Sequence, residues 1–435
     1  MPDSGGDSDL RGKDGALIRR KNDDIRSDFA MKILISGAGI AGLTLSFWLR
    51  LDDHDLTVVE KAPSLRDEGY MIDFFGSGYD VSERMLLLGD LEKIHYQISR
   101  LAFVDAHGRE KFSISYPSFR RLFDGRHFNF MRGDLERLLY SQIQDHLRIQ
   151  FGVTVESLRQ EDGKVEAKFS DGATGVFDLV VGADGAHSQI RKMAFGEEER
   201  FSHFLGYYTA AFIIDNPPES LTGADAFYTL TAPERQVGVY PIRGDRLATF
   251  FVYKARRPVN DFSFASAVRE LHNTYDGIGW IVPELLAQCE RSSLYFDEVS
   301  QIEMPLWSQG RVVLVGDACQ CVSLLAGQGA SMAMAGAYVL AQELAKAGRD
   351  VAAACAEYER KVKPGIEKKQ KAGRRLARWF VPDNRLQLLT RDLVTRMTDW
   401  PIARRAVKRA LAPESIFRLP PGLARRSIDC PALDK

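Results

Sequence analysis

Four short, mostly apolar runs lie along the chain, and each leads into a turn rich in glycine or polar residues. They cover residues 31–36, 56–60, 178–181 and 311–315. Strands that are apolar along their whole length are buried on both faces, as in parallel sheets covered by helices. Because helix-like stretches separate the runs, the pattern predicts an α/β fold with a mainly parallel sheet.

The middle of the chain follows a different pattern, with strand-like segments and many aromatic residues. Residues 201–254 contain four such segments, and residues 150–168 alternate and turn like a small meander. Helical spacing predicts an amphipathic helix over 132–143. We therefore expect a second, antiparallel sheet inserted into the first one between residues 196 and 284.

Composition narrows the class of protein without giving a function. The 435 residues include 58 Lys and Arg and 59 Asp and Glu, for a net charge of −1. This balance argues against nucleic-acid binding, which needs a basic surface. Five scattered cysteines and eight unpaired histidines form neither a disulfide framework nor a metal-ligand pattern, so we expect no metal and a cytoplasmic protein. No segment reaches the roughly 20 apolar residues of a membrane span, so we expect no transmembrane segment.

The first apolar run leads directly into a G-x-G-x-x-G motif at Gly37, Gly39 and Gly42. In a strand–turn–helix unit these glycines allow a tight turn, close approach of a pyrophosphate and packing of the helix on the strand. The helix N-terminus then offers free N–H groups to the phosphates. Glu60 ends the second run, where its carboxylate can accept hydrogen bonds from the ribose of an adenosine. The sequence thus predicts a dinucleotide site.

A second polar turn follows the last run, at Gly316 and Asp317. A glycine turn at Gly327 and Gly329 comes next, and a helix begins near Ala330. An aspartate at a strand end can bind a polyhydroxyl chain, or it can cap the next helix. N–H groups at the helix start could face a flavin and stabilise negative charge on it. The single G-x-G-x-x-G motif argues against a second Rossmann domain for NAD(P)H, and these downstream turns favour FAD as the bound dinucleotide.

Together these motifs resemble those of class A, single-component flavoprotein monooxygenases of the aromatic-hydroxylase type. Three fingerprints occur in the family's order: G-x-G-x-x-G at 37–42, Asp184-Gly185 within GADGAHSQIR, and Gly316-Asp317. Within the family, the segment EGYMIDFFGSG and the long C-terminal helix are most similar to tetracycline-degrading monooxygenases. The resemblance implies a Rossmann-like FAD-binding domain with an inserted antiparallel-sheet substrate domain and C-terminal helices.

The chain departs from the family next to the third fingerprint. Cys319 and Gln320 replace the usual Ala-His, Leu324 stands where a proline is expected, and Ser331 replaces a frequent asparagine. Cys319 and Cys321 form a C-x-C pair, which could be redox-active or hold a covalent flavin. Buried cysteines are more often packing residues, so we expect FAD to be bound non-covalently.

The resemblance implies roles for single side chains along the cofactor. Glu60 would bind the adenosine ribose, and Arg132 would contact FAD near its phosphates. Asp317 would hold the ribityl chain or the pyrophosphate. These three positions would thus bind the FAD between its adenosine and its ring.

Three further residues would lie nearer the reacting ring. Asp73 matches an aspartate that faces the flavin in the tetracycline-degrading branch. Arg66 lies in a loop whose basic residues meet the flavin or the nicotinamide cofactor, and Asp184 would support FAD and a transient NAD(P)H site. The implied reaction is hydride transfer from NADPH or NADH, formation of a flavin C4a-hydroperoxide with O2, and oxygen transfer to the substrate. Since the cofactor carries this chemistry, no catalytic side chain is assigned.

The aromatic block predicts the substrate pocket. Candidate lining residues are Tyr208, Phe212, Phe227 and Tyr240, and alternation along strands lets only about half of such residues point inward. An aromatic lining favours a planar substrate such as a phenol or a polyketide. The alternatives are an FAD halogenase or reductase on the same scaffold, or a non-catalytic flavoprotein that binds an antibiotic. The oligomeric state is open.

These expectations divide the chain into four parts, some of them discontinuous. They are a disordered leader (1–30), an FAD-binding domain (31–84, 117–195 and 285–350), a substrate domain (85–116 and 196–284) and bridging helices (351–435). The bridging helices would bury an apolar side made of Trp379, Phe380, Leu386, Leu389 and Leu393.

Overall fold

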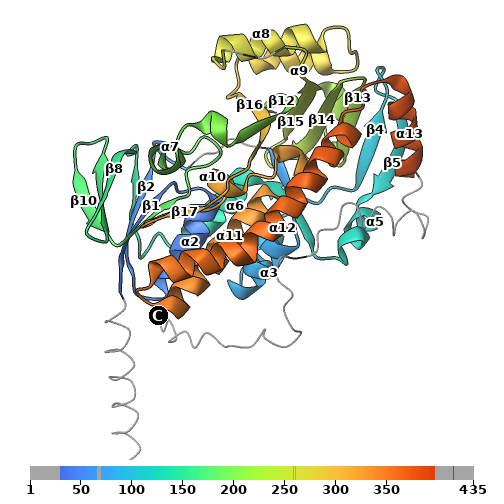
Figure 1. The fold of residues 1–435 in the computed structure, drawn as a ribbon. Helices are drawn as coiled ribbons and strands as arrows, with labels where there is room; N and C mark the ends of the chain where they lie inside the picture. The colour runs from blue at the N-terminus through green and yellow to red at the C-terminus, as the bar shows by residue number, and fades with distance from the viewer. Residues whose placement is uncertain (1–29, 66–69, 258, 260, 397–414, 416–435) are drawn as a thin grey trace, which may run out of the picture.

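Two large sheets organise the chain, and helices cover and connect them (Figure 1). The computed structural model describes residues 30–65, 70–257, 259, 261–396 and 415. Arg66 and residues 1–29 of the predicted leader lie outside this part of the chain. So do residues 397–414 and 416–435 of the predicted bridging helices.

The first sheet contains the four apolar runs, which confirms the prediction of a mainly parallel sheet. Its order is β17-β18-β11-β1-β2-β7. Neighbours from β18 to β7 pair in parallel, and β17 pairs antiparallel with β18. The strands are β1 (Lys32–Ser36), β2 (Asp55–Glu60), β7 (Ile149–Phe151), β11 (Leu179–Gly182), β17 (Ser308–Gln309) and β18 (Val312–Leu314).

Helices and two small sheets complete this half of the molecule. The meander predicted over 150–168 forms β8 and β9, extended by β10. Strands β3 and β6 form a separate, antiparallel two-stranded sheet. The elements are α2 (Ile40–Arg50), β3 (Met71–Phe75), α3 (Ser77–Arg84), α4 (Leu88–Ile94), β6 (His127–Met131), α6 (Arg132–Ser141), β8 (Val155–Glu161), β9 (Lys164–Phe169), β10 (Thr174–Phe177), α7 (Gln189–Phe195), α10 (Asp317–Gln320) and α11 (Gly329–Ala347).

The second large sheet has seven strands in the order β16-β12-β15-β14-β13-β4-β5. Its strands are antiparallel except for the β13–β4 pair. They are β4 (Arg100–Val104), β5 (Glu110–Ser115), β12 (Ser202–Ile214), β13 (Phe227–Ala232), β14 (Arg235–Ile242), β15 (Arg246–Lys254) and β16 (Tyr295–Ile302). The sheet therefore extends beyond residue 284 through β16, while the division into domains stays a prediction.

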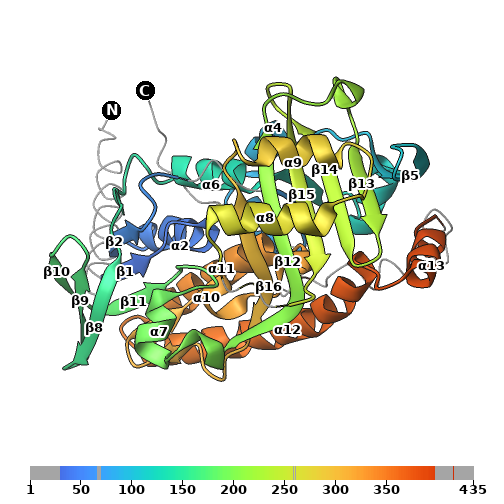
Figure 2. The same ribbon diagram turned by 90° about the horizontal axis from the view of Figure 1, so that it is seen from above.

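The two faces of the seven-stranded sheet pack against different partners. Helices α8 (Phe264–Tyr275) and α9 (Val282–Cys289) cross one face (Figure 2). Tyr208 and Phe212 are buried on that side, in one cluster with Val268 and Leu285 of these helices. Tyr240 belongs to a separate cluster with residues of β3 and β6. Side chains of one strand alternate between faces, so the aromatic residues are divided between two environments.

A long C-terminal helix, α12 (Val351–Phe380), packs on both halves of the molecule. Its first part joins the core of the parallel sheet through Tyr358 and Ile366. Its end joins a cluster with Tyr207 and Val252 of the seven-stranded sheet through Ala377. Among the described residues, no helix is long and apolar enough to cross a membrane.

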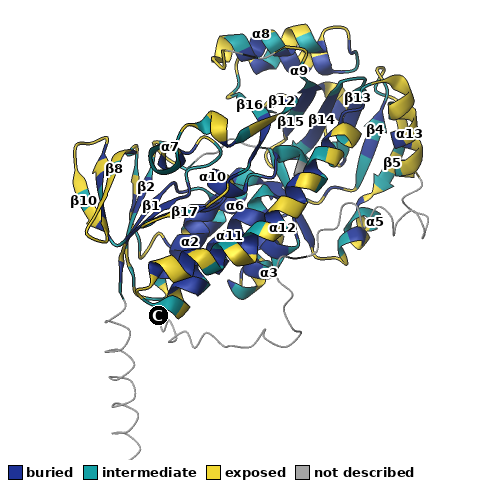
Figure 3. Ribbon diagram, in the orientation of Figure 1, coloured by how far each residue is buried: buried dark blue, intermediate teal, exposed yellow. Residues whose placement is uncertain are grey.

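The next helix, α13 (Arg385–Arg396), corrects one expectation about the bridging helices. Leu386, Leu389 and Leu393 are 71%, 65% and 60% exposed, so they form no buried side of a brace. Figure 3 shows α13 mostly exposed and the strands of the large sheet mostly buried. The apolar spacing of α13 was correct, but a helix buries such a stripe only where another element covers it.

The remaining short helices connect these elements. They are α5 (Tyr116–Arg120) and the single turns Arg121–Phe123, Glu198–Arg200, Glu219–Leu221 and Leu324–Ala326.

Candidate active site

The glycine loop between β1 and α2 is so tight that it excludes side chains at two of its three positions. Gly37 has a φ of +106°, and a Cβ there would lie 2.4 Å from the carbonyl oxygen of Ala183. A Cβ on Gly42 would lie 1.9 Å from the carbonyl oxygen of Gly37. At Gly39, by contrast, a Cβ would meet no backbone atom within 4 Å, and its nearest neighbours are Glu136 Oε1 at 3.5 Å and the Arg132 guanidinium at 3.7 Å. Gly39 thus faces side chains rather than backbone.

Glu60 lies beside this loop at the end of β2. Its Oε2 accepts a hydrogen bond from the Ala38 N–H at 2.8 Å, and its Oε1 accepts one from the Ala62 N–H at 2.9 Å. No side chain caps α2 at Gly39. The N–H groups of the first turn of α2 therefore receive no hydrogen bond from a capping side chain. The Glu60 carboxylate lies beside the same turn.

Gly316 brings the turn after β18 against the start of α2. Its φ is +64°, and a Cβ there would lie 2.6 Å from the Cβ of Ala41. Gly316 is also the N-cap of α10, and no side chain caps that helix. Asp317 is therefore not a helix cap, which removes the structural alternative raised by the sequence.

The Asp317 carboxylate lies near Arg132. The residue is exposed, and no hydrogen-bond partner of its side chain is found among the described residues. Desolvation by the surrounding protein nevertheless raises its pKa, against the opposing charge of Arg132. A Cβ on Gly39 would lie 3.7 Å from the Arg132 guanidinium, and one on Gly329 would lie 3.7 Å from Asp317 Oδ1. We call the space that Asp317, Arg132 and the glycine loop border the recess.

Arg132 begins α6 and faces the same recess. Its N–H donates to the Tyr70 carbonyl at 3.1 Å, and its Nη2 lies 2.8 Å from Glu136 Oε1. Burial opposes its charge, but Glu136, Tyr70 and Asp317 together raise its pKa. The Arg132 side chain is 31% exposed, so part of it remains available to a ligand.

The start of α11 completes the recess. The N-cap Gln328 makes no side-chain cap, and Gly327 before it has a φ of +62°. A Cβ on Gly329 would lie 3.7 Å from Asp317 Oδ1. Ala330 belongs to the first turn, whose N–H groups have no partner within the helix. Ser331 fixes this end by donating its hydroxyl to the Phe75 carbonyl at 2.9 Å.

Asp184 has a different environment from the other predicted cofactor residues. Its Oδ1 accepts from the Ser188 hydroxyl at 2.5 Å, and its Oδ2 accepts from the Ile190 N–H at 3.0 Å. Burial raises its pKa despite these bonds. Both oxygens thus bind the start of α7, so the carboxylate braces its own loop.

Asp73 lies on β3, and its partner was missed by the sequence analysis. Asp73 Oδ1 is 3.0 Å from Nε2 of the buried His127, and the aspartate side chain is 51% exposed. His127 occurs in no motif, and only the pairing of β3 with β6 brings the two residues together. No local pattern in the sequence indicates this pair.

A group of four aromatic side chains joins the recess to the seven-stranded sheet. We call it the aromatic seam, and its members are Tyr70, Phe227, Tyr240 and Tyr295. The Met71 N–H donates to the Tyr240 hydroxyl. The Tyr240 and Phe227 rings stack with centroids 5.1 Å apart. Tyr70 packs on Tyr295 at 5.8 Å. Of the four predicted substrate residues, the structure thus brings Tyr240 and Phe227 to this seam.

Tyr208 and Phe212 lie on the other face of the sheet. The Phe212 ring stacks on Phe251 at 5.5 Å, and Tyr208 stacks on Phe296 at 5.9 Å. The register of β12 places both side chains toward α8 and α9, because residues 208 and 212 differ by an even number. Their placement corrects the expectation that they share a pocket with Tyr240.

Cys319 and Cys321 have separate surroundings. Cys319 Sγ lies 3.9 Å from the Tyr358 hydroxyl, and Cys321 Sγ lies 3.6 Å from the Ser300 carbonyl oxygen. Burial raises the pKa of both thiols. This shift disfavours the reactive thiolate, and the described cysteines are free.

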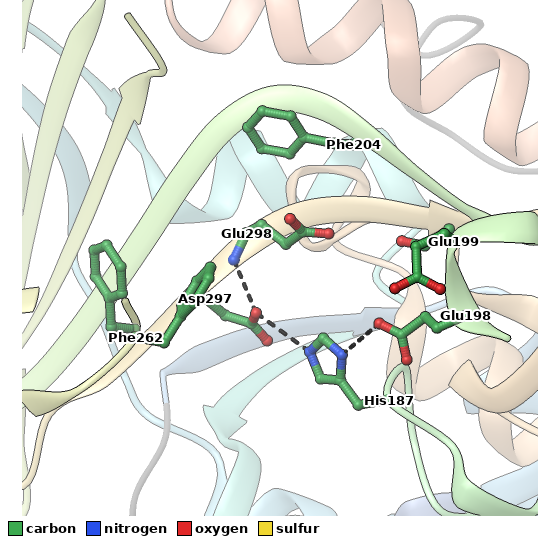
Figure 4. A pocket seen from close by; sticks show the side chains of 9 residues that line it. His187, Glu198, Glu199, Phe204, Phe262, Asp297 and Glu298 are labelled. Atoms are coloured by element: carbon green, nitrogen blue, oxygen red, sulfur yellow. Dashed lines mark hydrogen bonds and ion pairs between the residues drawn. The ribbon is translucent and has the colours of Figure 1, made fainter. Parts of the chain in front are cut away.

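A separate cavity of about 570 Å³ lies beside the Asp184 loop (Figure 4). His187 stands between Asp297 and Glu198, at 3.4 and 2.8 Å, and these two carboxylates raise its pKa to about 10. The lining residues are His187, Glu198, Glu199, Ser202, Phe204, Phe262, Phe296, Asp297 and Glu298. Within the described ranges, no cluster of three or more His, Cys, Asp or Glu could hold a metal ion.

Fold and site together define an α/β protein with a glycine loop of the dinucleotide-binding type and an aromatic antiparallel sheet. Residues 124–368 match the family model described as FAD binding domain. The chain is 35% identical over 358 residues to uncharacterized protein Rv1260 of Mycobacterium tuberculosis, covering 81% of this chain and 93% of that protein. It is 33% identical to a flavin-dependent monooxygenase of an unknown prokaryotic organism, over 82% of this chain and 91% of that protein.

A solved structure shows the same arrangement. The crystal structure of tetracycline destructase Tet(51) superposes with a TM-score of 0.78 at 29% identity, covering 90% of this chain and 99% of that one. The chain belongs to the class A FAD-dependent monooxygenases of the aromatic-hydroxylase type. It is accordingly a flavoprotein monooxygenase.

Proposed function

We propose that this chain uses NADPH or NADH and O2 to hydroxylate a planar aromatic or polyketide-like molecule. The observation that carries the proposal is the pair Arg132 and Asp317, which face one recess between the glycine loop and the aromatic seam. A halogenase or a reductase would use the same FAD recess, so the proposal needs a test of the reaction itself.

The residues of the recess fit FAD. Asp317 offers an unpartnered carboxylate, which the hydroxyl groups of a ribityl chain would satisfy. The uncapped start of α2 and the partly exposed Arg132 offer N–H donors and positive charge to a pyrophosphate. Glu60 would bind the adenosine ribose. Its carboxylate already accepts two backbone N–H groups, and its remaining lone pairs are available for hydroxyl donors.

The start of α11 would hold the reacting ring. Its free N–H groups and the positive end of its dipole would stabilise negative charge there, next to Ala330 and Gly329. When bound, FAD supplies hydride acceptance and oxygen activation. The protein supplies position and excludes water, and no side chain acts as an acid or base in this proposal. Arg66 keeps the role that the resemblance implies, while Asp184 would act by bracing the loop beside the cofactor.

The substrate would lie along the aromatic seam, against Tyr240 and Phe227 and opposite the cofactor recess. Tyr208 and Phe212 have no part in it, since they pack against α8 and α9. Stacked aromatic rings suit a flat substrate. The similarity to a protein described as a tetracycline destructase supports a polycyclic, polyketide-like molecule as the first class to test.

The test is to purify the protein and follow NADPH oxidation and O2 consumption with a library of phenols and tetracyclines. We expect the visible absorption of bound flavin, slow NADPH oxidation without ligand, faster oxidation with a substrate, and a product heavier by one oxygen atom. Flavin without turnover would indicate a binding protein. Turnover without oxygen incorporation would indicate a reductase, and chloride incorporation a halogenase. Each of these three results would contradict the proposal.

A further inference from the structure

A chain of hydrogen bonds runs from Asp73 into the protein interior. Asp73 Oδ1 lies 3.0 Å from His127 Nε2, and His127 Nδ1 lies 3.0 Å from the Tyr116 hydroxyl. That hydroxyl also lies 3.2 Å from Asn129 Oδ1. His127 is fully buried, and Tyr116 and Asn129 are nearly so. The cluster therefore connects one exposed carboxylate with three buried polar groups.

The Tyr116 hydroxyl determines which hydrogens His127 carries. A hydroxyl has one hydrogen, so it donates either to His127 Nδ1 or to Asn129 Oδ1. In the first case His127 is neutral, and its Nε2–H donates to Asp73. In the second case the Tyr116 oxygen accepts a hydrogen from Nδ1, and His127 is charged. The second state satisfies every group of the cluster, whereas the first leaves the buried Asn129 Oδ1 without the Tyr116 donor. In both states Nε2–H donates to Asp73.

The surroundings of His127 hold it in this position. Phe75, Phe119 and Phe123 pack on its ring at centroid distances of 6.0, 5.3 and 5.0 Å. The other titratable or charged groups that act on the cluster are His95, Glu92 and Arg120. A ring confined by three aromatic neighbours presents Nε2 to Asp73 in one fixed direction.

The strand that carries Asp73 is bound to the start of α11. Phe75, two residues further along β3, accepts the Ser331 hydroxyl from the first turn of that helix. Asp73 Oδ1 is bound by His127, whereas no partner of Oδ2 is found among the described residues. Because the hydrogen bond to His127 fixes Asp73 Oδ1, it also fixes the direction in which Oδ2 points.

We propose that His127, held by Tyr116, is a positioning residue for Asp73, whose Oδ2 accepts a hydrogen bond from an N–H or O–H donor of the bound FAD. This inference rests on the proposed function only in naming FAD as the ligand.

The first test is histidine 15N NMR of the full protein without ligand, with the His127→Gln spectrum used for assignment. We expect Nε2 of His127 to carry a hydrogen. Its resonance should shift in Asp73→Asn, because the hydrogen bond from Nε2–H then ends on a neutral amide instead of a carboxylate. An unprotonated Nε2, or an Nε2 resonance identical in Asp73→Asn, would overturn the proposal.

The second test is the dissociation constant of FAD from the apoprotein, by fluorescence titration. Asp73→Asn and His127→Phe should each weaken binding about tenfold, or about 1.4 kcal/mol. His127→Gln keeps an N–H donor toward Asp73 and should remain within about threefold of the unmodified protein. The exposed His272→Gln is the control and should bind FAD normally.

The outcomes separate the two proposals. Failure of the unmodified protein to bind FAD would refute the proposed function and leave the NMR result to decide the pairing of His127 with Asp73. Normal FAD affinity in Asp73→Asn would refute this inference alone. Since Asp73 is half-exposed, that variant is expected to fold even if His127→Phe does not.

Discussion

The cofactor recess and the seven-stranded sheet are built under different constraints. In the recess, the backbone makes the site: a Cβ on Gly42 would meet a carbonyl oxygen at 1.9 Å, and one on Gly316 would meet Ala41 at 2.6 Å. In the sheet, side chains make the site, and the same strand supplies one face to α8 and α9 and the other to the aromatic seam. At the closest backbone contacts of the recess, no side chain can replace a glycine without moving the loop. In the sheet, each substitution changes only the packing around one side chain.

The largest effect is expected from Gly42→Ala. The added methyl collides with the Gly37 carbonyl, so the loop must open, and we expect FAD affinity to fall at least about 100-fold, or about 2.8 kcal/mol. Fluorescence titration of the apoprotein measures this. The matched control is Gly89→Ala in α4, where a Cβ meets nothing within 4 Å. Equal affinity for the two variants would show that the loop does not bind the cofactor.

Phe212→Ala tests the face of the sheet under α8 and α9. The side chain is 2% exposed, so its removal should cost about 3–5 kcal/mol of unfolding free energy. FAD affinity should stay unchanged. Denaturant unfolding measures the first quantity, with the exposed Phe264→Ala as control. A change in substrate affinity at full stability would contradict our placement of Phe212.

Tyr240→Phe tests the opposite face. It removes the hydroxyl that accepts the Met71 N–H, at an expected cost of about 1–3 kcal/mol. It should also change the KM for the stimulating ligand. Tyr208→Phe is the matched control, because its hydroxyl accepts the Val259 N–H at 2.8 Å on the α8 side. Tyr208→Phe should lower the free energy of unfolding and leave KM unchanged. A changed KM in both variants would contradict the assignment of the substrate to the Tyr240 face alone.

A smaller, pH-dependent effect is expected at His187. Asp297 and Glu198 raise its pKa to about 10, so its charge stabilises the folded state fully below the ordinary pKa near 6.5. This contribution declines as the pH rises from there through about 10. Because the side chain is more than half exposed, the stability lost at pH 6 in His187→Gln should stay below about 1 kcal/mol. Thermal unfolding at pH 6 and pH 10 should show the difference only at pH 6.

The smallest effect is expected from Leu389→Ser on α13. The leucine is 65% exposed, so the unfolding free energy should change by less than about 0.5 kcal/mol. Ala377→Ser, in the buried part of α12, is the comparison and should destabilise more. A large loss in Leu389→Ser would mean that another part of the chain covers α13.

Sequence reasoning succeeded where local rules apply. The four apolar runs became neighbouring strands, and the glycine motif was found because its geometry depends on residues that are close in sequence. Gly316 and Asp317 were found for the same reason. Each of these signals is a short run or motif of fewer than ten consecutive residues, although the contacts that it makes in the fold are long-range.

The sequence could not supply what depends on long-range pairing. Alternation along β12 indicates that Tyr208 and Phe212 share a face, but it does not say which face α8 and α9 cover. His127 meets Asp73 because β6 pairs with β3 in one register, 54 residues apart. The exposure of Leu389 likewise depends on whether any element packs there. Such facts require the tertiary structure.

The position of α12 near the end of the described chain has a consequence for biosynthesis. One hydrophobic core contains both Met31, beside the first strand, and Ile366 of α12. The ribosome therefore releases β1 long before the helix that completes its core exists. Folding of this half must wait until almost the whole chain has emerged, and its apolar strands stay exposed to chaperones in the meantime.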